Sequence, residues 1–507
     1  MASRFGGPGL VELVQQVTRK AHLVAREQDG ALGLSERPGP GLVGAVPAMY
    51  PEWLGNQGFT EAHEVRFPYV AGEMAHGIAG VELVEAMAKD EMLGFFGAAG
   101  LSLERLDQEL ERLRTRLTGR GNWGVNLIHR PDDAAAEDAV AARLLRAGVP
   151  KISLSAFMDI TPAVVRCAAS GLRADAAGRI SRKTALFAKV SRPETAELFL
   201  SPPPAGLIRR LVDSGDLTEE EGHLAARVPV ADDITVEADS GGHTDSRPLM
   251  AILPAVLSLA RRRNPAVRVG AAGGLGDPAA VAAAFALGAA YVVTGSVNQM
   301  SVEAAVSDEA KAMLAQAGVA DVAMAPAGDM FELGAEVQVL RRGTMFAGRA
   351  ARLRRLHAEH PSWESIPGET RAALERDIFR ASWDEVWQQT AQYWSQRCPD
   401  EISRARSDPR HKMALVFRWY LGSSVGWAID GVPGRSSDYQ LWCGPAAGAF
   451  NTWVAGSFLS DPGGRAVTQI ARNLLQGAAV LTRAHQLSAL GVRLPRDAFD
   501  FRPRRLA

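Results

Sequence analysis

Residues 267–296, which read VRVGAAGGLGDPAAVAAAFALGAAYVVTGS, decide the fold. A short apolar run, Val267–Ala272, leads into a turn rich in glycine. The segment Ala279–Leu287 then has apolar residues near helical spacing, and a second apolar run, Ala290–Thr294, ends in Thr-Gly-Ser. A strand, a glycine turn, a helix and a second strand in this order are typical of one unit of a parallel sheet.

The same alternation extends back along the chain to Phe67. Short apolar and β-branched runs have the character of strands at Phe67–Ala71, Met92–Gly97, Trp123–Ile128, Lys151–Ala156, Ala185–Val190, Asp233–Ala238, Val267–Ala272 and Ala290–Thr294. Between them, apolar residues recur near helical spacing in Glu82–Ala88, Leu103–Leu117, Ala134–Leu145, Leu207–Asp213, Arg247–Arg263 and Ala279–Leu287. Eight strands with interleaved helices over roughly 230 residues predict the α/β class and a (β/α)8 TIM barrel. A doubly wound open sheet is the alternative, because a strand count from one sequence is uncertain by about one or two.

The rest of the chain differs in character from the barrel, which is predicted at residues 67–300. Residues 1–66 are rich in glycine and proline and form a lead-in that must pack on the barrel. Residues 301–490 predict an added helical subdomain, and residues 491–507 a C-terminal tail. The predicted helices of this subdomain are Ala304–Ala317, Ala347–Glu359, Thr370–Phe379, Trp383–Trp394 and Val467–Leu490. Eight of the ten tryptophans lie between Trp363 and Trp453, which indicates either a packed layer or a binding surface.

Composition excludes several kinds of partner. The chain has 507 residues, and its 56 Lys and Arg against 57 Asp and Glu give a net charge of -1, so neither a nucleic-acid footprint nor a polybasic membrane signal is present. No apolar run reaches the roughly 18 to 20 residues that a membrane span needs. The cysteines Cys167, Cys398 and Cys443 form no CxxC pair, which argues against a disulfide framework or a thiolate zinc site and favours a cytoplasmic protein. A homodimer is left open.

A cluster of polar residues, Glu237–Asp245, begins where the sixth predicted strand ends. Residues just past the strand ends form the active-site face of a (β/α)8 barrel, and the pair Gly241–Gly242 would let the backbone approach a ligand closely. His243 is therefore expected to project into the mouth, where its ring could hold a substrate oxygen or deliver a proton. The alternatives are a plain tight turn with a surface histidine, and a metal site from Asp239, His243 and Asp245. The metal site is disfavoured, because no further residue has ligand-like spacing, and no metal is predicted.

Two glycine turns follow the seventh and eighth strands. Gly273 and Gly274 precede a helix that starts near Asp277 or Pro278, so backbone donors and a helix N-terminus meet there. The stretch from Gly274 also mimics a dinucleotide-binding fingerprint, but the next strand ends in Thr-Gly295-Ser296 and not in the acidic residue that such a fingerprint requires. Two consecutive phosphate-type turns at these strands are what barrel enzymes use for a cofactor phosphate.

Other strand ends supply polar groups that a flavin ring would need at its edge. These are Gly72 and Met74 after the first strand, Asn126 on the third and Lys189 on the fifth. Lys189 could stabilise the negative charge that gathers near N1 of reduced flavin. A solvated or ion-paired lysine is the alternative for this position.

These segments resemble the PfaD family of trans-acting enoyl reductases, which serve polyunsaturated fatty acid and trans-acyltransferase polyketide synthases and fall within the nitronate monooxygenase-like FMN barrel superfamily. The resemblance runs from about Tyr50 to Leu490 and includes two later segments, Asp329-Met-Phe-Glu332 and Arg418-Trp-Tyr-Leu-Gly422, that the wider superfamily does not share. Where the family usually has Met-Ala-Asn-Gly, this chain has Met-Ala-His76-Gly.

The resemblance implies FMN as cofactor, NADPH as hydride donor, and an α,β-unsaturated thioester on an acyl carrier protein as substrate. It implies that Gly72, Met74 and Asn126 line the flavin ring and that Lys189 and Glu237 lie near it. His243 is the implied catalytic residue. The residues implied to hold the ribityl phosphate end are Gly241, Gly242, Gly273, Gly274, Gly295 and Ser296. A nitronate monooxygenase-like flavin oxidase, with oxygen as oxidant, is the alternative function, and a non-catalytic flavin-binding scaffold is the third.

Overall fold

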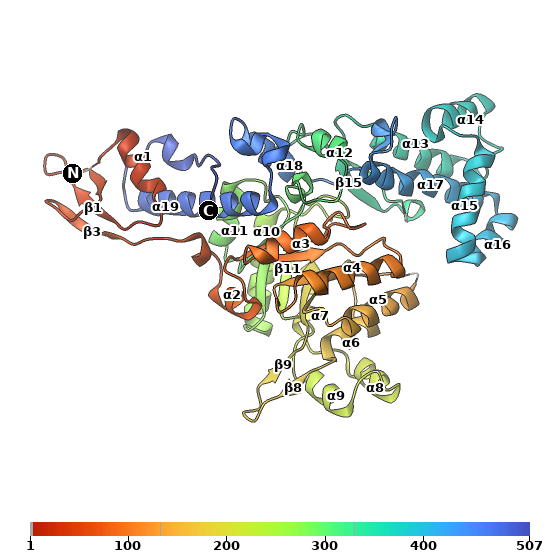
Figure 1. The fold of residues 1–507 in the computed structure, drawn as a ribbon, viewed down its shortest axis with the longest axis horizontal. Helices are drawn as coiled ribbons and strands as arrows, with labels where there is room; N and C mark the ends of the chain where they lie inside the picture. The colour runs from red at the N-terminus through yellow and green to blue at the C-terminus, as the bar shows by residue number, and fades with distance from the viewer. Residues whose placement is uncertain (1–3, 132, 329, 507) are drawn as a thin grey trace. The chain divides into compact units, whose positions relative to one another are not determined.

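The computed structural model describes residues 4–131, 133–328 and 330–506, and its centre is a closed barrel of eight parallel strands (Figure 1). The strands follow each other around the barrel in chain order, and β7 pairs with β10. They are β4 (Tyr69–Ala71), β5 (Leu93–Phe96), β6 (Trp123–Ile128), β7 (Lys151–Ser155), β10 (Ala185–Val190), β11 (Asp233–Glu237), β12 (Arg268–Ala272) and β13 (Val292–Thr294). The predicted (β/α)8 barrel is confirmed, and every predicted strand is present with its ends within two residues.

Strand register brings the segments that follow β13 and β4 side by side. In this pair Thr294 lies opposite Ala71, and the Gly72 N–H continues the ladder by donating to the Thr294 carbonyl at 2.9 Å. Because all strands are parallel, the residues after each carboxyl end gather at one edge of the barrel. The glycine turns predicted from sequence therefore share this edge.

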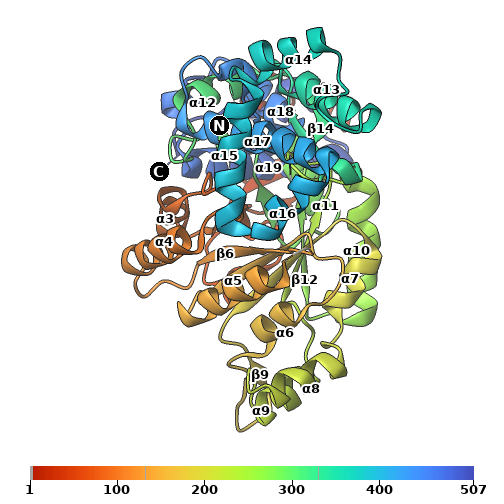
Figure 2. The ribbon, with the colours of Figure 1, turned by 90° about the vertical axis from the view of Figure 1, so that its right-hand side faces the viewer.

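Helices alternate with the barrel strands. Those between consecutive strands are α3 (Val81–Lys89), α4 (Leu103–Arg116), α5 (Ala134–Arg146), α6 (Pro162–Ala169), α7 (Pro193–Leu200), α10 (Leu249–Arg263) and α11 (Pro278–Ala286). Asp277 caps α11 by accepting a hydrogen bond from the Ala280 N–H, so this helix starts where the sequence predicted. Figure 2 shows an excursion below the barrel, made of β8 (Arg173–Ala174), β9 (Ile180–Ser181), α8 (Ala205–Asp213) and α9 (Glu219–Ala225).

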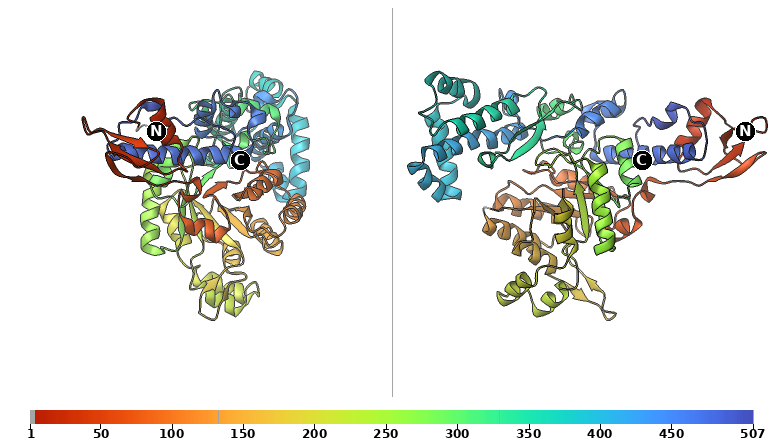
Figure 3. Two further views of the ribbon diagram at one scale, coloured as in Figure 1. Left: turned by 60° about the vertical axis from the view of Figure 1, so that its left-hand side comes forward. Right: turned by 180° about the vertical axis from the view of Figure 1, so that it is seen from behind.

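The two ends of the chain pack on each other, as both views in Figure 3 show. The N-terminal residues form α1 (Gly7–Gln15), an antiparallel sheet of order β2-β1-β3 and α2 (Gln57–His63), and the long helix α19 (Val467–Ala489) lies against α1. The three sheet strands are β1 (Ala21–Ala25), β2 (Leu32–Ser35) and β3 (Leu42–Val46). Leu10 and Val14 of α1 share a buried cluster with Leu487 of α19. The lead-in is thus an ordered part of the barrel unit.

The chain divides into two compact units. The barrel unit consists of Met1–Asp239, Ser246–Ala305 and Ala449–Ala507, and the helical unit of Ser240–Asp245 and Val306–Gly448. Helix α19, which the sequence grouped with the helical subdomain, belongs to the barrel unit, where Gly477 lets Pro278 of α11 approach so closely that a Cβ would lie 2.5 Å from its Cγ. Among the described residues, no helix combines the length and apolar character of a membrane span.

The helical unit has its own core. Its helices are α12 (Asp308–Leu314), α13 (Phe346–Glu359), α14 (Gly368–Leu374), α15 (Trp383–Arg397), α16 (Pro399–Ser407) and α17 (Pro409–Asp430), and it contains an antiparallel hairpin of β14 (Val322–Pro326) and β15 (Glu336–Leu340). Helix α18 (Ala446–Val454) connects the two units along the chain. Trp363 and Trp383 stack at 4.2 Å between ring centroids, and Trp419, Trp427 and Trp442 pack against the same core. These tryptophans therefore form a packed layer, which is one of the two roles that the sequence predicted for them.

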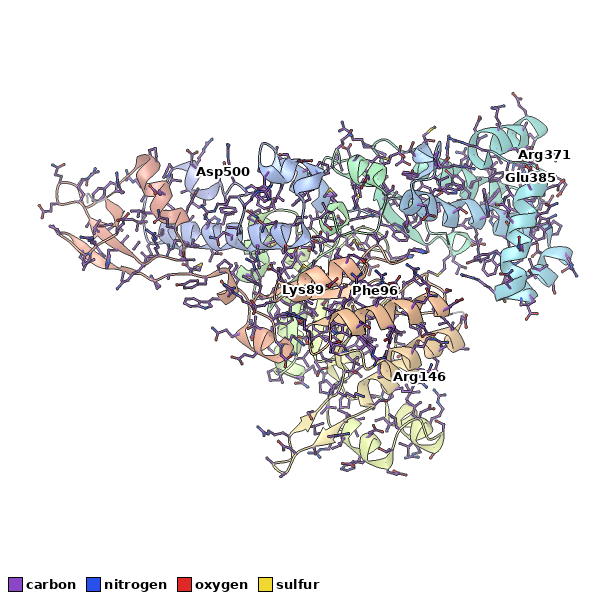
Figure 4. The ribbon with its side chains drawn as sticks, in the orientation of Figure 1. Lys89, Phe96, Arg146, Arg371, Glu385 and Asp500 are labelled. Carbon is purple, nitrogen blue, oxygen red and sulfur yellow. The ribbon has the colours of Figure 1, made fainter. Side chains whose placement is uncertain are left out.

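Short local signals set the ends of these helices. Figure 4 labels Arg371 on α14 and Glu385 on α15. The side chain of Ser382 accepts from the Glu385 N–H, and Glu385 in turn accepts from the Ser382 N–H at 2.8 Å, which makes a capping box at the start of α15.

Candidate active site

A partly buried charged network lies at the carboxyl edge of the barrel. Lys189 of β10 places its Nζ 2.9 Å from Oε1 of Glu237, the last residue of β11, and 3.4 Å from Oε1 of Glu73, which follows β4. The side chain of Glu73 is 6% exposed, that of Lys189 15% and that of Glu237 26%. The network therefore opens toward solvent at Glu237 and closes toward the barrel interior at Glu73.

The charge of Lys189 and hydrogen bonds from two serines keep Glu73 ionised inside the barrel. Its Oε1 accepts from the hydroxyls of Ser155 at 2.7 Å and Ser153 at 3.0 Å, both on β7. Burial alone would raise the pKa of Glu73, but the Lys189 ammonium and the serine hydroxyls outweigh burial and hold this pKa below its usual value. Burial likewise opposes the charge of Lys189, but Glu237 and Glu73 raise its pKa. Lys189 is thus an ion-paired lysine whose positive charge is offset locally.

The side chain of Asn126 holds the segment that follows β5 by hydrogen bonds. Its side chain is buried on β6, and its Oδ1 accepts from the N–H groups of Ala98 at 2.8 Å and Ala99 at 3.3 Å. Among the described residues no acceptor is found for its Nδ2, so this amide group is the part of Asn126 that can serve a ligand.

The segments after β4 and β5 pack backbone against backbone. A Cβ on Gly97 would lie 1.7 Å from the carbonyl oxygen of Met74, so only glycine fits there. The His76 N–H donates to the Ala99 carbonyl at 2.7 Å, and His76 has a φ of 58°, in the left-handed region. Asn and His tolerate this region better than most residues, so the backbone here suits either the histidine present or the asparagine that the resemblance implies.

The turns after β12 and β13 combine strained glycines with open space. Gly273 has a φ of 87°, and a Cβ there would lie 2.7 Å from the carbonyl carbon of Ala238. A Cβ on Gly274, where φ is 71°, or on Gly295 would meet no atom within 4 Å. Ser296 follows Gly295, and the N-terminus of α11 follows Gly274 by four residues. The turns thus offer an open cradle with backbone donors and a helix dipole, which suits a phosphate.

The segment Ser240–Asp245 belongs to the helical unit and packs against β15 and Cys443 there. The Gly242 N–H donates to the Gln338 carbonyl at 2.9 Å and the Gln338 N–H donates back at 2.7 Å. A Cβ on Gly241 would lie 2.6 Å from the Cα of Cys443. Gly241 is therefore required by its packing on Cys443, whereas Gly242 is favoured by its φ of 80°, in the left-handed region. The sequence predicted that Gly241 and Gly242 lie at the phosphate end of FMN, and this stays a prediction; the Gly242 N–H itself is engaged by the Gln338 carbonyl. His243, at the tip, is exposed.

The structure gathers most of the predicted residues at one barrel edge and adds others. Gly72 follows β4, Glu237 ends β11, and Lys189 and Asn126 lie in the carboxyl-terminal halves of β10 and β6. The turns at Gly273 and Gly295 follow β12 and β13. Glu73, Ser153 and Ser155 were not predicted. The alternation in Lys-Ile-Ser-Leu-Ser of β7 was the available signal, because a serine at every second position gives the strand a polar inner face. Among the described residues, no group of three potential ligands could hold a metal ion.

Comparison with known proteins agrees with this architecture. A family model described as nitronate monooxygenase matches residues 56–377, and one described as the inserted helical domain of [acyl-carrier-protein] S-malonyltransferase matches residues 360–439. The chain is similar to one of the polyunsaturated fatty acid synthase subunits of Thraustochytrium sp., with 44% identity over 448 residues, 86% of this chain and 30% of that protein. It is similar to the polyketide biosynthesis protein PksE of Bacillus subtilis, with 41% identity over 437 residues, 85% of this chain and 56% of PksE.

A solved structure is similar to this chain over the full length of an enoyl reductase domain. The crystal structure of the enoyl reductase domain of MlnA, from the macrolactin biosynthesis cluster of Bacillus amyloliquefaciens, has a TM-score of 0.82 and 35% identity and covers 86% of this chain and 99% of that domain. The chain spans less than two thirds of the curated relatives named above. The fold and the matches define an oxidoreductase of the nitronate monooxygenase family. Within that family the chain belongs to the PfaD group, as its motifs predicted.

Proposed function

We propose that the chain is an FMN-dependent enoyl reductase that uses NADPH to reduce the α,β-double bond of an enoyl thioester carried by an acyl carrier protein. The observation that carries the proposal is the pair of open glycine turns at the same barrel edge as the partly buried Lys189 network. The relatives named for polyketide and polyunsaturated fatty acid synthesis and the enoyl reductase domain of MlnA support the substrate class. The match to an insert of a transferase named for acyl carrier protein supports the carrier.

The residues present fit FMN. Gly273, Gly274, Gly295 and Ser296 would hold the phosphate, because space is open where side chains would stand and the start of α11 favours an anion. The residues that would line or approach the ring are Gly72, Met74, Asn126, Lys189 and Glu237. When bound, FMN would supply the relay of a hydride from NADPH to the substrate.

The chain's own groups would manage charge and protons. Reduction adds a hydride at Cβ and a proton at Cα of the enoyl thioester and oxidises NADPH to NADP+. The thioester oxygen gains negative charge while the hydride is transferred, so a donor at this oxygen lowers the barrier. His243 is proposed for this role. The carboxylates of Glu73 and Glu237 would hold the Lys189 ammonium at one position.

One spectroscopic experiment tests the function. The purified protein is loaded with FMN under anaerobic conditions, and its visible flavin absorbance is followed on addition of NADPH and then of a crotonyl thioester. The proposal predicts loss of the absorbance with NADPH and its full return with the thioester, with one equivalent of butyryl product. An unchanged spectrum after NADPH contradicts the proposal and favours the non-catalytic scaffold.

The family match to nitronate monooxygenase supports a second candidate, a flavin oxidase. The same reduced sample distinguishes the two. If the chain is an enoyl reductase, the absorbance returns much faster with the crotonyl thioester than with dissolved oxygen. A faster return with oxygen, together with turnover of a nitronate, assigns the chain to the oxidase.

The role of His243 has its own test. His243→Ala should leave FMN binding intact and lower kcat for the enoyl thioester by about 10²- to 10⁴-fold, the range of a lost general acid or hydrogen-bond donor. The rate of flavin bleaching by NADPH should change little in the same variant. Unchanged enoyl turnover removes His243 from the mechanism.

A further inference from the structure

A basic pocket of about 560 Å³ lies within the helical unit. It is formed by the 3-10 turn η3 (Phe331–Leu333), helix α13 and the start of α17, and its volume is that of a small-molecule site. Its charged lining consists of four arginines and one glutamate: Arg352, Arg354, Arg355, Arg410 and Glu332. Such an excess of positive charge around a concavity favours an anion as ligand.

Two of the four arginines interact with other groups of the protein, and two have side chains that can bind a ligand. Arg354 pairs with Glu336 at 2.8 Å, and Arg410 donates to the carbonyls of His357 and Ala358 at the end of α13. Arg352 and Arg355, three residues apart and therefore on one face of α13, form no ion pair within 4.0 Å with another described residue. Their guanidinium forks match the paired oxygens of a phosphate.

The wall of the pocket contains an acceptor without a donor. Nε and Nη2 of Arg418 both lie 2.9 Å from Oε1 of Glu332, which ties η3 to α17. The other oxygen of Glu332, Oε2, is buried and has no hydrogen-bond partner among the described residues. Leaving such an oxygen unsatisfied is costly. Glu332 lines the pocket, so its carboxylate is also the group to which a hydroxyl or amide of a bound anion can donate.

An apolar residue stands beside this charged site. Leu333 is 82% exposed although it is large and apolar, and it lies between Glu332 and Gly334, which both line the pocket. The ring of His357 packs edge-on to Phe331, with 5.3 Å between the ring centroids. Burial and the charge of Arg410 lower the pKa of His357, so the positive charge of the pocket comes from its arginines. An exposed leucine next to a phosphate-type pocket suits a protein that presents a phosphorylated arm.

We propose that this pocket binds the phosphodiester of the phosphopantetheine arm on the acyl carrier protein. Arg352 and Arg355 would bind the phosphate, and the hydroxyl group of the arm would donate to Glu332. Leu333 would contact the carrier protein itself. This inference rests on the proposed function, because that function requires a carrier-bound substrate.

Binding measurements test the inference without turnover. The full chain is titrated with holo carrier protein, apo carrier protein, 4′-phosphopantetheine and inorganic phosphate. The wild type should bind holo carrier at least tenfold more tightly than apo carrier, and 4′-phosphopantetheine more tightly than inorganic phosphate. Equal affinity for holo and apo carrier overturns the proposal, and so does equal affinity for 4′-phosphopantetheine and inorganic phosphate.

Substitutions locate the site. The double variant Arg352→Gln and Arg355→Gln should lose about tenfold or more in affinity for 4′-phosphopantetheine and should no longer distinguish holo from apo carrier. Arg209→Gln with Arg210→Gln on α8 removes the same charge from two exposed arginines elsewhere and should change these affinities less than twofold. Arg352→Lys with Arg355→Lys keeps the charge without the fork and should retain only part of the affinity. Wild-type affinity in the glutamine variant overturns the proposal.

The result is separable from that of the proposed function. If the chain reduces no enoyl thioester but binds 4′-phosphopantetheine through Arg352 and Arg355, the site stands and the reductase assignment fails. If it reduces a crotonyl thioester while binding is indifferent to both arginines, only the site fails.

Discussion

Glu73 connects three strands of the barrel through one carboxylate. It follows β4, accepts from Ser153 and Ser155 of β7, and lies 3.4 Å from Lys189 of β10. A buried charge is tolerated only when it is paired and hydrogen-bonded, and Glu73 is both. A neutral residue of the same shape would leave the contacts with the serine hydroxyls in place. It would remove one of the two carboxylate charges that pair with the Lys189 ammonium.

Glu73→Gln should lower the free energy of unfolding by about 2 to 3 kcal/mol, because it removes one partner of a buried ion pair while Glu237 remains. It should also weaken FMN binding, since Lys189 is then held on one side only. Urea unfolding and FMN titration measure the two effects.

Glu82→Gln on α3 is the matched control. Its carboxylate pairs with Arg112 and Arg116 on the surface and its side chain is 50% exposed, so the loss should stay below about 1 kcal/mol. Equal losses in the two variants would show that the charge of Glu73 has no special role.

At the scale of elements, strands were easier to predict than the helical unit. The barrel strands are short apolar runs closed by glycine or polar residues, and this local signal survives in any tertiary context. Helix α17 carries buried residues from His411 to Ala428 around its whole circumference and so lacks an amphipathic stripe. The first strand of the hairpin, β14, contains two alanines and ends at Pro326, both of which weaken a strand signal. The role of Glu73 could not be predicted, because it depends on contacts with β7 and β10, which lie far away in the sequence.

The opposite edge of the barrel holds a second charged cluster at the first residues of two strands. Asp233 of β11 and Arg268 of β12 are opposite each other in register and form two hydrogen bonds, at 2.7 and 2.8 Å. His63 of α2 lies 2.8 Å from Asp233, and both side chains are buried. Burial lowers the pKa of His63 below 6.5 despite the neighbouring carboxylate.

This cluster predicts that the barrel loses stability as pH falls below about 6.5. Below this pH the His63 side chain is protonated in the unfolded chain but stays neutral in the native state until its lower native pKa is reached. Between these two pKa values the free energy of unfolding declines by up to about 1.4 kcal/mol per pH unit. Above a pH of about 6.5 His63 contributes no slope. His63→Gln, which can still donate to Asp233, should flatten the curve between these limits. Urea unfolding at a series of pH values measures the slope, and an unchanged slope in the variant would refute this role.

At the scale of the whole molecule, Arg483 ties the two ends of the barrel unit together. This residue of α19 is buried, and its guanidinium donates to the carbonyls of Gln16 at 3.0 Å, Arg19 at 3.1 Å and Pro47 at 2.5 Å. Burial lowers its pKa. One side chain thus satisfies three backbone acceptors of the N-terminal segment, which could otherwise not be buried against α19.

Arg483→Met should therefore lower the free energy of unfolding by about 3 kcal/mol and expose the N-terminal segment first. Hydrogen exchange should show faster exchange in α1 and β1 while the barrel strands stay protected. Arg496→Met, at an exposed position, should change neither quantity. Wild-type protection of α1 in Arg483→Met would contradict this account.

If the turns after β12 and β13 bind FMN by its phosphate, the dissociation constant for riboflavin, which lacks the phosphate, must exceed that for FMN. We expect FMN to bind about a hundredfold or more tightly than riboflavin, as about two charge-assisted hydrogen bonds would give. Gly274→Asp should abolish this ratio, because aspartate tolerates the left-handed φ of 71° but repels a phosphate, whereas Gly274→Asn should keep most of it. Equal affinities for FMN and riboflavin in the wild type would contradict the claim.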